Sequence, residues 1–322
     1  EGFSKIALNA TDRALLEGLV DWLVEPCLCA VRKEVKEMSP TVDSNLVVSL
    51  LHILEALLEQ CMVKFALDEG QSKLDAKQLK NRQQDIECSF LFALVWSIGK
   101  TGTEESQSKF CTFLENILNS LDAIESDYPQ VWNALQMRKW VKPDFLQAKN
   151  GVKGSFILPM PMKQDYYECI YNTSDSKWKY WVDLLDTHKI PADALYSSIV
   201  VPNNFTAQFG YLLELLLPHG FHTLMCGPTG TGKSVYINNT ISKVMPQSVY
   251  KPLSLGFSAK TSANMTQDII DGKLDKRRKG VYGPPMGLKT LIFVDDLNMP
   301  EVEIYGAQPP IDNLACRGAL WK

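Results

Sequence analysis

Eight consecutive residues in the second half of the chain, Gly227 to Ser234, have the types and spacing of a phosphate-binding loop. They read Gly-Pro-Thr-Gly-Thr-Gly-Lys-Ser and fit the pattern GxxxxGK[ST]. Glycines let such a loop adopt positive φ angles, so that successive backbone N–H groups converge on phosphate oxygens. We expect the cofactor-binding loop to consist of Gly227, Pro228, Thr229, Gly230, Thr231, Gly232, Lys233, Ser234 and Val235.

The last two residues of this motif carry its chemistry. Lys233 is expected to hold a positive charge beside the β- and γ-phosphates of a nucleotide, which gives it a catalytic role, and Ser234 to offer its hydroxyl to Mg²⁺. Phe221 to Cys226 has the length of a buried strand before the loop, and Val235 to Val244 reads as a helix after it. The alternative is a chance Gly-rich turn, and the order of strand, loop and helix argues against it.

A second motif further along the chain supplies acidic groups. Leu291 to Val294 are four apolar residues that end in Asp295 and Asp296, a pattern typical of a buried parallel strand whose tip presents a carboxylate to a metal. We expect Asp295 to share Mg²⁺ with Ser234, and Asp296 to orient or deprotonate an attacking water. A turn-capping role is the alternative for Asp296, because a short acid also bonds local N–H groups. The predicted cofactors are ATP and Mg²⁺.

Helices and strands must position these groups. Apolar residues at helical spacing predict four helices in the first part of the chain, which pack into one core. Pro26 is expected to end or kink the first of them, and a short helix is expected around Trp178 and Trp181. A further strand is expected near Val249 to Phe257. The four apolar stripes are Leu15–Leu23, Leu46–Cys61, Phe90–Ile98 and Phe110–Leu121.

Composition changes between Lys142 and Pro161, where Pro, Gly and Lys favour turns and an extended path. We therefore expect a helical domain at residues 1–141, a connector at 142–175 and a P-loop domain at 176–322. The first residue is Glu1, with no signal-peptide pattern after it, so the chain reads as a piece of something longer.

Charge and apolar content exclude several classes of partner. The chain has 33 Lys and Arg against 37 Asp and Glu, a net charge of -4, so no overall basic field exists to hold nucleic acid or an anionic membrane. The run Lys276 to Lys279 is interpreted as a solvated loop or a protein contact. Eight cysteines without a CxxC pair are expected to be reduced and to act as small hydrophobes.

Several segments together resemble the heavy chain of axonemal dynein, and specifically its third AAA+ module. They are Gly227–Ser234, Asn264–Gln267, Lys276–Pro285 and Phe293–Pro300. Upstream, Trp22–Leu28, Asn45–Leu50 and Phe90–Gly99 resemble the helical lid of the second AAA+ module. The resemblance implies an all-α lid subdomain, followed by an incomplete α/β P-loop AAA+ large subdomain, a parallel sheet flanked by helices. By analogy, Ile199 to Pro202 would line the adenine end of the pocket.

The resemblance also implies partners and a place in the cell. These are the neighbouring AAA+ modules of the same heavy chain and, through the parent protein, dynein light and intermediate chains and microtubules, in the cytoplasm and cytoskeleton at the axoneme of a cilium or flagellum. Nucleic acid and membrane are not expected as direct partners.

Turnover by this chain is expected to be low. After Ile311 the sequence departs from the family pattern, and an arginine finger would come from a neighbouring module. We expect a regulatory site that binds ATP weakly and hydrolyses it slowly. The alternatives are a free-standing AAA+ ATPase and a scaffold with a vestigial P-loop.

Overall fold

A computed structural model describes residues 8–69, 76–119, 122–141, 156–160, 166–185 and 201–320. The chain forms two compact units, of which the first ends at Gly227 and the second begins at Pro228. Much of the expected connector lies outside the described residues, as do Ile199 and Val200. The domain boundaries proposed from the sequence therefore stay predictions.

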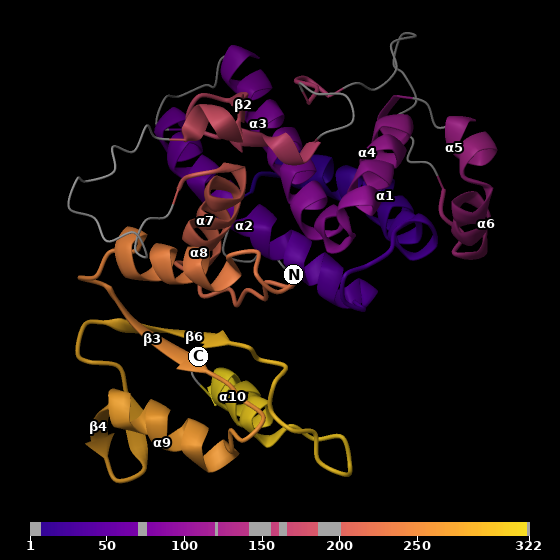
Figure 1. The fold of residues 1–322 in the computed structure, drawn as a ribbon. Coiled ribbons are helices and arrows are strands. Elements are labelled where there is room, and N and C mark those ends of the chain that lie inside the picture. Colours follow the sequence, from indigo (N-terminus) through magenta and orange to yellow (C-terminus); the bar gives the residue numbers. More distant parts are fainter. Residues whose placement is uncertain are drawn as a thin grey trace. The chain divides into compact units, whose positions relative to one another are not determined.

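Helices dominate the first unit, and Figure 1 colours them from indigo through magenta to orange. The four apolar stripes correspond to the first four of these helices. None of the described helices combines the length and the apolar character that crossing a bilayer requires. The helices are α1 Ala10–Glu34, α2 Asp43–Glu69, α3 Ala76–Ser97, α4 Glu104–Asn119, α5 Asp122–Asp127, α6 Pro129–Met137 and α7 Asn204–Leu216, with short 3-10 turns at Gly99–Thr101, Tyr166–Glu168 and Trp181–Leu184.

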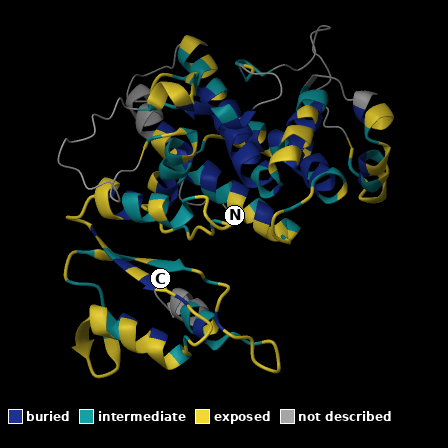
Figure 2. Ribbon diagram, in the orientation of Figure 1, coloured by how far each residue is buried: buried dark blue, intermediate teal, exposed yellow. Residues whose placement is uncertain are grey.

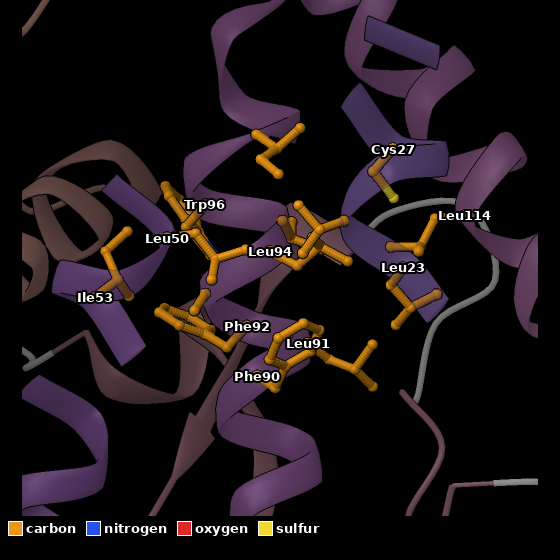
Figure 3. Packing of buried hydrophobic residues seen from close by; sticks show 14 of the residues in the cluster. Leu23, Cys27, Leu50, Ile53, Phe90, Leu91, Phe92, Leu94, Trp96 and Leu114 are labelled. Atoms are coloured by element: carbon orange, nitrogen blue, oxygen red, sulfur yellow. The ribbon is translucent and has the colours of Figure 1, made fainter. Parts of the chain in front are cut away.

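The core of the first unit forms around α3, whose second half is apolar on every side. Residues from Phe90 to Trp96 are at most 5% exposed, and a helix that is apolar all round has to be covered all round. Side chains of the neighbouring helices provide this cover, and Figure 3 shows Leu23 and Cys27 of α1, Leu50 and Ile53 of α2 and Leu114 of α4 around α3. The predicted helical core is confirmed.

Of the two outcomes expected for Pro26, an end of the helix or a kink, the structure excludes the first. The helix runs without a break from Ala10 to Glu34, and Pro26 lies inside it and is buried. A proline inside a helix loses one backbone hydrogen bond and costs about 3 kcal/mol. Around it, Trp22 and Leu23 before the proline and Cys27 and Leu28 after it are all buried. This packing outweighs the local cost.

The short helix predicted around Trp178 is also wrong in part. Trp178 lies in β2, Lys177–Tyr180, which pairs antiparallel with β1, Cys169–Asn172. The side chain of Asn172 accepts hydrogen bonds from the backbone N–H groups of Ser174 and Asp175, which stabilises the turn between the strands. The 3-10 turn follows at Trp181, whose indole N–H donates to the Tyr167 carbonyl at 2.8 Å.

Residues 221–228 form neither a strand nor a helix, so the strand predicted at Phe221 to Cys226 is absent from this structure. The ring of Phe221 stacks on His52 of α2, with ring centroids 4.0 Å apart. Leu224, at the centre of the segment, is 73% exposed. One end of the apolar run therefore packs inside the first unit, while the rest stays at the surface.

The second unit combines helices with a small parallel sheet. Within the described residues this sheet consists of β3 and β6, and a separate antiparallel pair is formed by β4 and β5. The elements are α8 Lys233–Asn239, a π-helical turn Thr240–Val244, β3 Tyr250–Gly256, α9 Ala263–Lys273, β4 Asp275–Arg278, β5 Val281–Gly283, β6 Lys289–Asp295 and α10 Pro309–Leu320. The strand expected near 249–257 and the strand ending in Asp295 are both confirmed, and they lie side by side (Figure 1).

Burial in the second unit is lower than the sequence predicts. Figure 2 shows most of its residues as intermediate or exposed, and Ile292, at the centre of β6, is 39% exposed. A strand is buried on both faces only when other elements pack on both faces of its sheet. Within the described residues β6 has β3 as its only strand partner, so the predicted strand forms but its predicted full burial does not. A small apolar cluster built on Leu253, Leu255 and Ile270 forms the core.

Candidate nucleotide site

The loop before α8 has the backbone that its glycines predict. Gly230 and Gly232 both have a φ angle of 82°, in the left-handed region. Only glycine adopts this conformation without steric cost, because an L-residue would bring its Cβ against the following carbonyl. The loop turns sharply at both glycines before α8 begins at Lys233.

Lys233 folds back over this loop. Its Nζ donates to the Pro228 carbonyl at 2.6 Å and lies 3.3 Å from Thr231 Oγ1. The Thr231 hydroxyl itself donates to the same carbonyl at 2.9 Å. These contacts tie the ammonium group to the carbonyl and hydroxyl groups of the loop itself.

Ser234 and Asp295 are brought together, as the sequence predicts. The Ser234 hydroxyl donates to Asp295 Oδ1 at 2.8 Å, although the two residues are 61 positions apart in the chain. Ser234 lies in the first turn of α8, and Asp295 is the last residue of β6. Both side chains are partly exposed rather than sealed in a core. An ion that contacts one of these oxygens can also contact the other.

Asp296 follows Asp295 but has a different conformation and environment. Its φ angle is 54°, a left-handed value that is uncommon outside glycine. Its N–H donates to Asp295 Oδ1 at 3.1 Å, and its carbonyl accepts from the Met299 N–H at 3.0 Å. The residue is exposed. Its backbone thus takes part in a turn that follows the end of β6.

The remaining loop residues are at the surface. Gly227, Pro228 and Thr229 are exposed, and Val235 is 52% exposed. Gly227 is the last residue of the first unit, whereas Pro228 to Val235 belong to the second. The geometry of the site is therefore described by Pro228 onward, together with Asp295 and Asp296.

Two residues of this region were not singled out by the sequence. A side chain at Gly232 would meet the ring of Tyr236 at 3.1 Å, so this tyrosine lies against the loop. Gly256, at the end of β3, pairs in register with Asp295, and a Cβ added to it would meet nothing within 4 Å. An aromatic residue in the turn after the motif and a glycine at a strand end were visible signals, but neither is specific by itself.

The basic run Lys276 to Lys279 forms part of a hairpin. Four exposed residues of β4 precede a turn at Gly280, whose φ angle is 75°, and β5 follows. The guanidinium of Arg277 donates to the Pro284 carbonyl across the hairpin. The segment is solvent-exposed, as expected, but it is a pair of strands rather than a loop.

Comparison with known proteins accounts for nearly the whole chain. A family model described as "Dynein heavy chain AAA lid domain" matches residues 16–183, and one described as "P-loop containing dynein motor region" matches residues 188–315. The chain belongs to the dynein heavy chain family. The expected fold class, a helical lid followed by an incomplete α/β P-loop region, is confirmed by these matches together with the helical and parallel-sheet units.

Individual dynein heavy chains are similar over most of this chain. Dynein axonemal heavy chain 3 of Homo sapiens is 34% identical over 314 residues, 96% of this chain and 7% of that protein. Dynein axonemal heavy chain 1 of Mus musculus is 37% identical over 284 residues, 88% of this chain and 6% of that protein. For dynein axonemal heavy chain 12 of Rattus norvegicus the identity is 34%, over 93% of this chain and 9% of that protein. The chain thus spans less than a tenth of the length of these relatives.

Proposed function

We propose that this chain is a nucleotide-binding segment of an axonemal dynein heavy chain, which holds ATP and Mg²⁺ between the loop 227–235 and the end of β6. The observation that carries the proposal is the hydrogen bond of 2.8 Å between Ser234 Oγ and Asp295 Oδ1. It joins the end of a phosphate-binding motif to an acidic strand tip. This is the juxtaposition that a shared Mg²⁺ requires.

The residues present fit these cofactors. Hydroxyl and carboxylate oxygens are hard ligands of the kind that Mg²⁺ takes, and Mg²⁺ commonly uses few protein ligands in addition to phosphate oxygens. The positive φ angles of Gly230 and Gly232 open the loop backbone toward a ligand. When bound, the ion would neutralise charge on the β- and γ-phosphates. Lys233 would contribute a second positive charge, and Ser234 and Asp295 would hold the ion in place.

We further propose that the site is regulatory and hydrolyses ATP slowly. Asp296 would orient or deprotonate the attacking water, but its carboxylate is one methylene shorter than that of glutamate, and a misplacement of about 1 Å can cost about 100-fold in rate. The residue is also exposed, with a left-handed backbone.

The parent protein would be an ATP-dependent microtubule motor of the cilium or flagellum. The similarity to axonemal heavy chains, 34 to 37% over most of the chain, supports this role and a location in the axoneme. The neighbouring AAA+ modules of the same heavy chain would be the direct partners. Light and intermediate chains and microtubules would be reached through the rest of the parent.

Calorimetric titration of Mg·ATP into the full chain tests the nucleotide site. We expect saturable binding that Lys233→Ala weakens about 10- to 100-fold, the worth of one charge-assisted hydrogen bond. Lys243→Ala is the matched control, because Lys243 is an exposed lysine in the π-helical turn that follows α8. Binding by the unmutated chain that survives Lys233→Ala unchanged would contradict the proposed site. No binding at all would favour a scaffold with a vestigial loop.

A further inference from the structure

Two polar side chains on one face of α8 each bond a different strand of the parallel sheet. Ser234 donates to Asp295 on β6 at 2.8 Å, and Asn238 Oδ1 accepts a hydrogen bond from the Ser254 hydroxyl on β3 at 3.0 Å. Residues four apart on a helix lie on the same face. Ser234 and Asn238 are therefore a pair of attachment points on the side of α8 that faces the sheet.

The two attachment points on the sheet also share a face. Gly256 pairs in register with Asp295, and Ser254 precedes Gly256 by two residues on the same strand. Side chains alternate along a strand, so the side chains of Ser254 and Asp295 lie on the same face of the sheet, the face to which a Cβ at Gly256 would also point. Two residues along a strand span about 6.6 Å, and four residues along a helix rise about 6 Å. The spacing of the two bonds along the helix therefore matches their spacing along the strand direction. Across the sheet the two bonds are offset by one strand spacing, about 4.8 Å.

Two contacts fix an orientation that one contact leaves open. A helix held only through Ser234 can still rotate and slide about that point, whereas the Asn238 contact one turn later restricts both motions. Within the described residues, the space beside Asp295 is kept open by Gly256, where an added Cβ would meet nothing within 4 Å. The Ser234 oxygen is thus held beside an open space next to the Asp295 carboxylate.

We infer that Asn238, through Ser254, is a positioning residue for the metal at the nucleotide site, which sets the place of the Ser234 hydroxyl relative to Asp295. This inference rests on the proposed function and deepens it. Neither Asn238 nor Ser254 is among the residues proposed to contact the nucleotide or the metal. Losing their bond should weaken the contribution of Mg²⁺ to ATP binding and leave the binding of metal-free ATP unchanged.

The test compares ATP affinity with Mg²⁺ and with EDTA in the full chain, for two variants of Ser254 that are isosteric with each other. Ser254→Thr keeps a hydroxyl that can donate to Asn238, whereas Ser254→Val has the shape of threonine without the hydroxyl. Asn238→Ala removes the acceptor, and Asn239→Ala controls for the helix propensity of the same substitution at the next position. We expect Ser254→Val and Asn238→Ala to lower the ratio of ATP affinity with Mg²⁺ to ATP affinity with EDTA about fivefold, which corresponds to one ordinary hydrogen bond. Ser254→Thr and Asn239→Ala should retain it.

Two binding results would overturn the inference. One is an unchanged ratio of ATP affinity with Mg²⁺ to affinity with EDTA in Ser254→Val and Asn238→Ala. The other is an equal loss of affinity with and without Mg²⁺, which would indicate a general structural role.

If the affinity of the unmutated chain for ATP does not increase with Mg²⁺, the proposed function fails separately from the inference. Amide hydrogen exchange of α8 then tests the positioning role, because Ser254→Val but not Ser254→Thr should accelerate it. Equal exchange in both variants would refute the positioning role.

Discussion

Gly230 and Gly232 provide a matched pair of substitutions that measures how tightly the phosphate-binding loop is packed. Both have a φ angle of 82°, so alanine at either position incurs the same left-handed strain, about 1–2 kcal/mol. Their surroundings differ. A Cβ at Gly230 meets nothing within 4 Å, whereas a Cβ at Gly232 lies 3.1 Å from Cζ of Tyr236.

The difference between the two alanine variants therefore isolates the contact with Tyr236. The ring has to move by a few tenths of an ångström, and leaving a preferred rotamer costs about 0.5–1.5 kcal/mol. We expect Gly230→Ala to destabilise the second unit by about 1–2 kcal/mol and Gly232→Ala by about 0.5–1.5 kcal/mol more. In a Tyr236→Leu background the excess should vanish, because leucine has no atom at the Cζ position. In a Tyr236→Phe background it should persist.

Native-state hydrogen exchange of the β3 and β6 amides is the appropriate assay, because it reports the opening free energy of the second unit alone. Tryptophan fluorescence would not isolate the second unit, since six of the seven tryptophans lie at positions 22 to 181, within the first unit. Equal costs for Gly230→Ala and Gly232→Ala would refute the packing argument. An excess that survives in Tyr236→Leu would refute it as well.

Three further predictions concern charged groups. Burial raises the pKa of Glu87, partly offset by the Ile157 N–H that donates to it. The free energy of unfolding of the unmutated chain should therefore fall as pH rises from about 4.3 through that raised pKa. Over this pH range Glu87→Gln should become more stable relative to the unmutated chain, as measured by denaturation followed by tryptophan fluorescence. Asp12→Ala should cost about 3–5 kcal/mol by the same assay, because it leaves the nearly buried Arg82 without the carboxylate 2.6 Å away, and Asp12→Ala with Arg82→Met should recover much of this loss. Asp296→Gly should slow hydrogen exchange of β6, because glycine adopts the left-handed backbone conformation of residue 296 without strain, and it should raise the free energy of opening by up to about 1 kcal/mol. Asp296→Asn should not change the exchange.

The elements that the sequence predicts well are those whose local pattern and tertiary setting agree. The stripe from Phe90 to Ile98 is long and apolar, and it becomes the buried centre of the first unit. The apolar run before Asp295 becomes β6, and the order of loop and strand is enough to predict that Ser234 and Asp295 meet. Their chemical roles at the site remain predictions.

The elements that the sequence misses are those where a contact distant in the chain decides. Phe221 stacks on His52, 169 positions away by their numbers, and no local pattern indicates that contact. Pro26 remains helical because tertiary packing around it exceeds its local cost. The hairpin at Trp178 is different, because Asn172 and the polar residues after it were a readable turn signal between two aromatic strands.

The positioning of Ser254 and Asn238 could not be read from the sequence at all. Both are ordinary polar residues, and their contact depends on the packing of α8 on β3. Gly256 is similar, since its importance follows only from its register opposite Asp295. Sequence patterns identify groups that touch a ligand more readily than groups that hold those groups in place.

Exchange of the metal-binding hydroxyl for a thiol tests the central claim most directly. With Mg²⁺, Ser234→Cys should bind ATP at least about tenfold more weakly than the unmutated chain, because a thiol is a poor ligand for Mg²⁺. With Cd²⁺ the variant should regain this affinity, because a thiol is a good ligand for a soft ion. The unmutated chain with Cd²⁺ is the control, since Cys226 already offers an exposed thiol. If Ser234→Cys binds Mg·ATP as well as the unmutated chain, and Cd²⁺ makes no difference, Ser234 does not hold the metal and the account of the site is wrong.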